Sequence, residues 1–132
     1  MHTKEVLSTF VDASLLLNGV YDVVCALSIL WLPTSRLGRL HIHVFKKTET
    51  RSSNRIFAYW VLTYGLDRIV AGMYSSPATD VIAVLSYLME SAAYFNEAST
   101  FKSVDTYKAM FVYLISMALA MMVGIRLFIS LT

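Results

Sequence analysis

The stretch from residue 54 to 74, NRIFAYWVLTYGLDRIVAGMY, is long and apolar enough to cross a lipid bilayer, yet it carries Asp67 and Arg68 inside the apolar run. A helical crossing needs about 20 mainly apolar residues. Charged side chains are costly in hydrocarbon, so those within a crossing almost always face a protein interior or a water-filled cavity. This stretch therefore predicts a membrane helix whose charged groups are buried against neighbouring helices.

The composition indicates an integral membrane protein of one domain. Of the 132 residues, 57% are hydrophobic and 15% are charged, and the mean hydropathy is +0.59. A soluble fold of this size would lack the polar residues to cover its surface. The single cysteine, Cys25, lies inside the first apolar block, so no disulfide can form within the chain.

The apolar blocks predict an all-α, integral membrane four-helix bundle, with residues 1–132 forming a single membrane domain. The blocks are longer than strands and do not alternate with period two. Pro33 ends the first block, because proline cannot donate the next backbone hydrogen bond. Thr79 and Asp80 are good residues to cap the third helix. The expected helices cover residues 7–32, 55–74, 79–98 and 104–131.

The one long connection, between the first two helices, is basic. Its basic residues are Arg36, Arg39, Lys46, Lys47 and Arg51, and Arg55 follows at the start of the next helix. The single acidic residue of the loop is Glu49. Cytoplasmic loops carry the excess of Lys and Arg. We therefore expect this loop to be cytosolic and both termini to lie on the opposite side of the membrane.

Apolar residues alternate with polar ones inside this loop. Leu40, Ile42, Val44 and Phe45 suggest a segment that lies on an anionic membrane surface; the alternative is a solvated loop that only sets topology. His41 and His43 form an isolated His-x-His pair. We interpret them as interfacial loop residues, because a metal site needs more ligands.

Polar side chains line up on the helices at spacings of three and four residues, which places them on one face. They are Ser14, Asn18, Asp22 and Cys25 on the first helix, Trp60, Tyr64 and Arg68 on the second, and Tyr87, Glu90, Tyr94 and Glu97 on the third. Folding the helices about their connections brings Arg68 to the level of Glu90, with Asp22 as a second candidate partner. The same folding places Arg126 near Asp80.

Two interpretations of these polar groups remain open at this point. In the first, the groups form a proton relay, supply a catalytic acid or line a ligand pocket. In the second, they form interhelical hydrogen bonds that fix the packing of the bundle. No Gly-rich phosphate loop or nucleophile elbow is present in the sequence. We expect no catalytic residue, cofactor, metal site or nucleic-acid partner.

The order of several residues resembles a known family. These residues are Arg55, Phe57, Trp60, Leu62 and Arg68, then Phe95, Glu97 and Thr100, then the run 121–126 (MMVGIR), with Asn18 on the first helix. The pattern resembles the ergosterol biosynthetic protein 28 family, mainly over residues 55–126. The resemblance implies a small four-helix scaffold of the endoplasmic reticulum membrane, not itself an enzyme, that holds the sterol C-4 demethylation enzymes together. The positions of this sequence that match the family's motif residues are Arg55, Trp60, Arg68, Glu97 and Arg126.

Three functions follow as hypotheses. The first is a non-catalytic scaffold whose partners are other integral membrane proteins, including sterol-synthesis enzymes, and membrane lipids. The second is an accessory subunit of another large membrane assembly, such as a respiratory complex, which would place the chain in the mitochondrial inner membrane. The third is a small membrane enzyme or lipid-binding protein that uses Glu90 and Arg68. A scaffold should have a filled interior, whereas the third function needs a cavity of ligand size with convergent polar groups.

Overall fold

The computed structural model describes residues 2–32, 41–45 and 51–132. Over these residues the fold is all-α, as predicted, with four long helices and one π-helical turn. They are α1 (His2–Trp31), α3 (Arg51–Met73), α4 (Pro77–Asn96), the π-helical turn η1 (Glu97–Phe101) and α5 (Thr106–Leu131). By length and composition, α1 and α5 are each able to cross a membrane.

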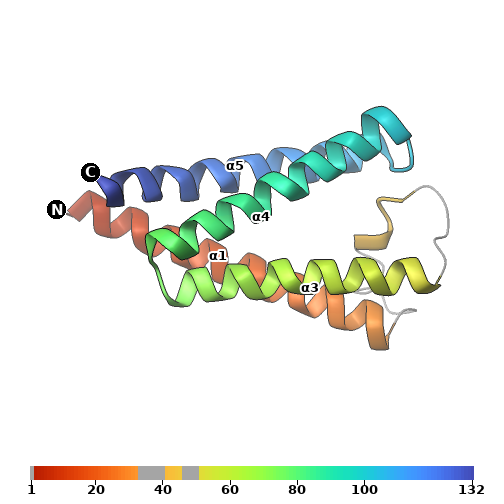
Figure 1. Cartoon of the computed structure of the whole chain (residues 1–132), viewed down its shortest axis with the longest axis horizontal. Helices are drawn as coiled ribbons and strands as arrows, with labels where there is room; N and C mark the ends of the chain where they lie inside the picture. The colour runs from red at the N-terminus through yellow and green to blue at the C-terminus, as the bar shows by residue number, and fades with distance from the viewer. Residues whose placement is uncertain (1, 33–40, 46–50) are drawn as a thin grey trace.

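The helices form two antiparallel pairs. Figure 1 shows α1 beside α3 and α4 beside α5, with both termini at the same end of the molecule. The two pairs meet in a core of mainly small and β-branched side chains from all four helices. Its members are Val11, Leu15, Ala71, Ala83, Tyr87, Ala120 and Val123. Large apolar side chains such as Leu17, Ile56 and Phe128 point outward and are exposed, as expected for helices that face lipid.

The start of α4 corrects the predicted cap. Ser76, not Thr79 or Asp80, is the N-cap residue. Its hydroxyl accepts a hydrogen bond from the Thr79 backbone N–H (3.2 Å), while the Thr79 hydroxyl accepts one from the Ser76 N–H (3.0 Å). Pro77 occupies the first helical position, where a missing N–H costs nothing. The helix therefore begins two residues earlier than expected.

The other helix ends also differ from the expected ones by a few residues. α1 and α3 begin earlier, at His2 and Arg51, and α4 ends at Asn96. After η1 the chain turns at Lys102, whose backbone is left-handed with φ of 53°. α5 begins at Thr106 because the Asp105 carboxylate accepts hydrogen bonds from the N–H groups of Tyr107 and Lys108, both at 3.1 Å.

Part of the predicted basic loop lies outside the described residues. This applies to Pro33, Arg36, Arg39, Leu40, Lys46, Lys47 and Glu49. The described part, residues 41–45, contacts the bundle. Val44 is buried in a cluster with Tyr94, Val104 and Ala109, and its carbonyl accepts a hydrogen bond from the Asp105 N–H at 2.8 Å. Val44 thus corrects both sequence interpretations: it packs inside the protein instead of on a membrane surface or in solvent.

Glycines allow α1 and α3 to approach each other backbone to backbone. A Cβ atom added at Gly19 would lie 2.6 Å from the Gly65 carbonyl oxygen, and one added at Gly65 would lie 2.9 Å from the Gly19 oxygen. Both distances are shorter than any normal van der Waals contact. Close contacts of this kind between small residues are a common way for membrane helices to associate.

We predict that Gly19→Ala weakens the α1–α3 contact, because one of the two backbones must move. Overpacking of this kind costs about 1–3 kcal/mol. The matched control is Gly124→Ala on α5, where an added Cβ meets nothing within 4 Å and where alanine is the better helix former. The measurement is the thermal midpoint of the purified protein in mild detergent. Equal midpoints for the two variants would contradict the tight contact.

Candidate functional site

Arg68 of α3 lies at the centre of the bundle, with a side chain that is 1% exposed. Its Nη1 donates to Asp22 Oδ2 of α1 at 2.5 Å, and its Nη2 donates to Glu90 Oε2 of α4 at 2.6 Å. The predicted Arg68–Glu90 pair is therefore confirmed, and Asp22 is a partner as well. A guanidinium is the group best suited to bridge two carboxylates, because its donors form a planar fork.

Neutral side chains occupy the other donors of Arg68. Its Nε donates to the Ser86 hydroxyl at 3.2 Å, and Nη1 also donates to Asn18 Oδ1 at 3.1 Å. The ring of Tyr87 lies against the guanidinium, with 3.9 Å from Cζ to the ring centroid. Residues of α1, α3 and α4 thus surround one cation, which is the condition for burying it at tolerable cost.

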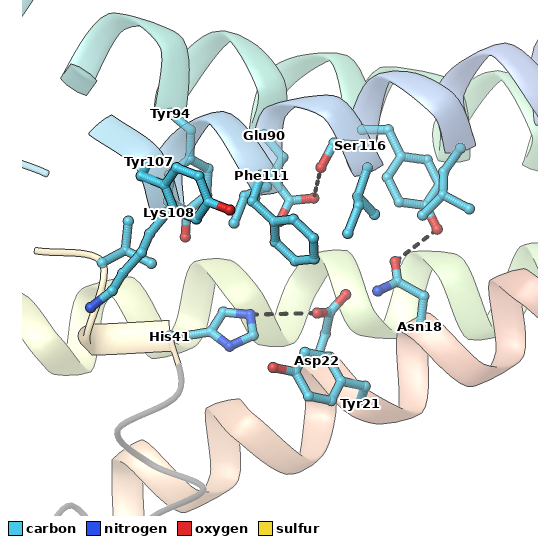
Figure 2. A pocket seen from close by; sticks show the side chains of 15 residues that line it. Asn18, Tyr21, Asp22, His41, Glu90, Tyr94, Tyr107, Lys108, Phe111 and Ser116 are labelled. Atoms are coloured by element: carbon cyan, nitrogen blue, oxygen red, sulfur yellow. Dashed lines mark hydrogen bonds and ion pairs between the residues drawn. The ribbon is translucent and has the colours of Figure 1, made fainter. Parts of the chain in front are cut away.

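The same network extends to α5 through one hydrogen bond and gains another between α4 and α1. Ser116 donates to Glu90 Oε2 at 3.1 Å, and the Tyr87 hydroxyl donates to Asn18 Oδ1 at 2.8 Å. Figure 2 shows the contact between Ser116 and Glu90. The Arg68 network, defined as Arg68 with Asn18, Asp22, Ser86, Tyr87, Glu90 and Ser116, therefore joins all four long helices.

His41 closes one side of this network, and the sequence interpretation of it was wrong. Its side chain is 11% exposed, and its Nε2 lies 3.6 Å from Asp22 Oδ1 (Figure 2). Its ring contacts those of Tyr21 and Phe57. Burial alone would lower the pKa of His41, but hydrogen bonding to Asp22 and Cys25 and the negative charge of Asp22 outweigh burial and raise the pKa to about 9. A protonated His41 balances the second carboxylate of the network.

A second buried ion cluster lies nearer the chain termini. Arg126 of α5 donates through Nε to Asp80 Oδ2 at 3.0 Å, and its Nη2 donates to the other oxygen of Asp80. Its Nη1 donates to Asp12 of α1. The predicted proximity of Arg126 and Asp80 is therefore confirmed. Asp12 was not predicted as a partner, because its contact with Arg126 depends on how α1 and α5 pack against each other.

A cavity of about 640 Å³ lies beside the Arg68 network, between α1, α4, α5 and residues 41–45. Its polar lining includes Asn18, Asp22, His41, Glu90, Tyr94 and Ser116, and its apolar lining includes Phe111, Ile115 and Leu119. Figure 2 shows these side chains converging from facing helices. The volume falls within the range of small-molecule sites, about 300–1,000 Å³.

The remaining predicted residues lie apart from the cavity. Arg55 is exposed, and its Nη2 is 3.4 Å from the Ser52 hydroxyl. The Trp60 ring packs between Phe57 and Tyr64, at centroid distances of 5.7 and 4.8 Å. Glu97 accepts a hydrogen bond from Ser103 at the start of η1. These residues shape the end of the bundle where η1 lies, and within the described residues none of them has a hydrogen bond or ion pair with Arg68.

Asp67 does not join the Arg68 network, although it is the next residue along α3. Within the described part of the chain it has neither a hydrogen bond nor an ion pair, and its side chain is partly exposed. Successive residues on a helix point about 100° apart. Asp67 therefore lies on the outer side of α3, in line with the exposed residues Tyr59 and Thr63.

The arrangement offers binding and packing more readily than metal chemistry. In residues 2–32, 41–45 and 51–132, no group of three His, Cys, Asp or Glu side chains is placed to hold a metal ion. Asp22 and Glu90 each accept a hydrogen bond from the guanidinium with one carboxylate oxygen. Their second oxygens are not bound by Arg68, and of these Asp22 Oδ1 lies 3.6 Å from His41 Nε2.

Comparison with known proteins gives one match. A protein-family model described as "Erg28 like protein" matches residues 9–122. The matched range includes every residue of the Arg68 network and of the cavity lining, whereas Arg126 lies just beyond it. The searches of curated proteins and of solved structures found no match.

We predict that Arg68→Met strongly destabilises the bundle, because it leaves two buried carboxylates without their cation; breaking a buried pair costs about 3–5 kcal/mol. Adding Glu90→Gln should recover part of the loss. The measurement is a double-mutant cycle on the thermal midpoint in detergent, with the exposed Arg55→Gln as control. Effects of the two substitutions that simply add would show that these residues are not coupled.

We predict that the packing of residues 41–45 weakens at alkaline pH. The folded-state pKa of His41, about 9, lies above its ordinary value of 6.5. The stability that protonation contributes is therefore fully present below pH 6.5 and is lost as the pH rises through about 9. Histidine NMR titration and the thermal midpoint measure this, and His41→Gln should remove the dependence while His43→Gln keeps it. A His41 that titrates near 6.5 would overturn the prediction.

Proposed function

The chain belongs to the Erg28-like family, and from that premise we propose that it is a non-catalytic scaffold of the endoplasmic reticulum membrane that holds the sterol C-4 demethylation enzymes together. The family supports a membrane protein associated with sterol biosynthesis. It also favours the endoplasmic reticulum over the mitochondrial inner membrane. The partners in this proposal are integral membrane enzymes and the surrounding lipids.

The proposal includes four crossings by a single membrane domain. α1 and α5 are apolar enough by composition alone. α3 and α4 have 23 and 20 residues, long enough to cross about 30 Å of hydrocarbon. Their hydropathy is lowered by Arg68, Asp80 and Glu90, which are neutralised by partners inside the bundle. The lengths and the inward charges together support all four crossings.

The observation that carries the scaffold function is how the charges are distributed across the bundle. The Arg68 network and the Arg126 cluster neutralise charges between the helices, whereas long apolar side chains cover the outer faces of all four helices. A bundle joined in this way presents rigid apolar faces to other membrane proteins. Coupling enzymes requires only such complementary faces and no catalytic group.

Asp67 supports the outer face of α3 as a partner-binding face. It lies about 18 Å along the helix from Arg55, at 1.5 Å per residue, which is well inside the proposed crossing. A carboxylate at such a depth is costly, about 2.5–3.5 kcal/mol on insertion scales. A partner helix that offers a basic or hydrogen-bond-donating side chain would offset that cost.

Lipid binding is a second candidate function, and the cavity favours it. A scaffold alone was expected to have a filled interior, but the structure contains about 640 Å³ of cavity with convergent polar groups. Holding partner enzymes and binding a lipid use different surfaces of the same bundle. One function therefore does not exclude the other.

The proposed topology gives a direct prediction. The basic loop is cytosolic by the excess of Lys and Arg, and Lys102 and Lys108 lie at the same end, where Lys108 Nζ is 3.2 Å from the His43 carbonyl oxygen. We expect a cysteine at Ser52 to react with a membrane-impermeant reagent from the cytosolic side and one at Ser76 from the lumenal side, both in a Cys25→Ala background. Reaction of both from one side would contradict four crossings.

The scaffold function predicts that Asp67→Leu reduces the recovery of partner enzymes in mild-detergent affinity purification, while the thermal midpoint stays unchanged or rises. The matched control is Leu85→Ala on α4, an exposed residue on another face. The readout is quantitative mass spectrometry of the co-purifying proteins. If the purified chain alone converted a sterol substrate, the scaffold proposal would give way to an enzyme.

A further inference from the structure

The cavity beside the Arg68 network contains polar groups that the bundle itself does not use. Tyr94 is 5% exposed and extends from α4 in the direction of His41 (Figure 2), yet within the described residues its hydroxyl makes no hydrogen bond. Its oxygen is accessible from the cavity that Tyr94 lines, whereas the buried hydroxyl without a partner among the described residues is that of Tyr64. Here a ligand in the cavity would provide the missing hydrogen bond.

Groups of both hydrogen-bonding kinds lie on this polar side. Acceptors are the carboxylate oxygens that Arg68 leaves free, Glu90 Oε1 and Asp22 Oδ1, the second of which lies 3.6 Å from His41. Donors are the Tyr94 hydroxyl and the side-chain NH₂ of Asn18, whose oxygen is taken by Arg68 and Tyr87. A ligand group that both donates and accepts would satisfy this combination, as a hydroxyl does.

The charge of the lining argues against ionic head groups. Arg68 and a protonated His41 balance Asp22 and Glu90 without the ligand, and the one further charged side chain in the described lining is Lys108. Lys108 is already in contact with the His43 carbonyl oxygen. An ammonium cannot accept a hydrogen bond and a phosphate would face two carboxylates. A neutral head group fits the balance better than either.

The rest of the cavity is apolar and elongated. Tyr107, Phe111, Ile115 and Leu119 line it at intervals of four residues along α5, a distance of about 18 Å at 1.5 Å per residue. Tyr107 and Phe111 are 86% and 63% exposed, so this wall opens to the surroundings of α5. In a membrane, that opening faces lipid and gives a lateral path into the cavity.

We propose that the cavity binds a neutral lipid alcohol, with its hydroxyl between Tyr94, Asn18, Asp22 and Glu90 and its apolar body along Phe111, Ile115 and Leu119 of α5. Sterols and diacylglycerols both carry such a hydroxyl on an elongated apolar body. The proposal rests on the lipid-binding function proposed above and is independent of the scaffold function, because the outer face of α3 is not part of the cavity.

The test is photo-crosslinking of the purified full-length chain in phosphatidylcholine nanodiscs. Four photoactivatable probes are compared: a sterol, a diacylglycerol, sphingosine and phosphatidic acid. We expect saturable labelling by the sterol or the diacylglycerol probe, competition by the same unlabelled lipid, and labelled peptides from the cavity side of α5. Labelling only by sphingosine or phosphatidic acid, or labelling that no lipid alcohol competes, would overturn the proposal.

Two matched pairs of variants locate the binding. Tyr94→Phe removes one hydroxyl and should raise the half-saturating concentration of the alcohol probe about fivefold, the effect of one hydrogen bond. Tyr113→Phe is the control, because Tyr113 contacts Phe95 outside the cavity, and it should not change that concentration.

The second pair tests the space in the cavity. Ile115→Trp should block labelling, whereas Leu114→Trp, on the exposed side of α5, should not. Equal labelling of all four variants would assign the signal to the lipid-facing surface and reject the cavity. Loss of labelling with co-purification of partners intact would separate this proposal from the scaffold.

Discussion

One buried guanidinium constrains this fold more than any other group. Arg68 sits within a proposed membrane crossing, where its charge cannot be left without partners. Its donors reach Asn18 and Asp22 on α1 and Ser86 and Glu90 on α4. These contacts fix the axial position of both helices relative to α3, because a shift of either helix by one turn would leave a carboxylate or the cation unpaired. Ser116 adds α5 to the same arrangement through Glu90.

The cavity follows from how the two helix pairs are held. Gly19 and Gly65 let α1 and α3 touch along their backbones, whereas the ring of Tyr87 lies between α4 and the guanidinium. The pairs are therefore joined through large polar side chains on the level of Arg68, and beside them space remains toward α5. Residues 41–45 bridge the pairs at the opposite end from the termini, where Val44 packs with Tyr94 and Val104.

The sequence predicted those contacts that depend on depth along regular helices. Arg68 with Glu90 and Asp22, and Arg126 with Asp80, could be paired by counting residues from the turns, because each residue advances about 1.5 Å. His41 and Asp12 could not be found in this way. His41 reaches Asp22 from a connection whose path has no helical period, and Asp12 reaches Arg126 only because α1 and α5 meet near the termini. The α4 cap was missed because Thr79 and Asp80 are also of the residue types that cap helices, although Pro77 fits the first helical position and thereby indicates Ser76 as the cap.

Two neighbouring residues of α3 separate the two proposed functions. Arg68 points inward and holds the groups that line the cavity, while Asp67 is turned about 100° away toward the exposed residues of the same helix. A lipid alcohol in the cavity would add hydrogen bonds to Glu90 and Asp22 and would stabilise the folded bundle in proportion to its occupancy. The outer face of α3 would gain rigidity from this without any contact with the lipid. A scaffold of this design could therefore hold its partners more firmly when a lipid alcohol is abundant, since both surfaces depend on the position of a single helix.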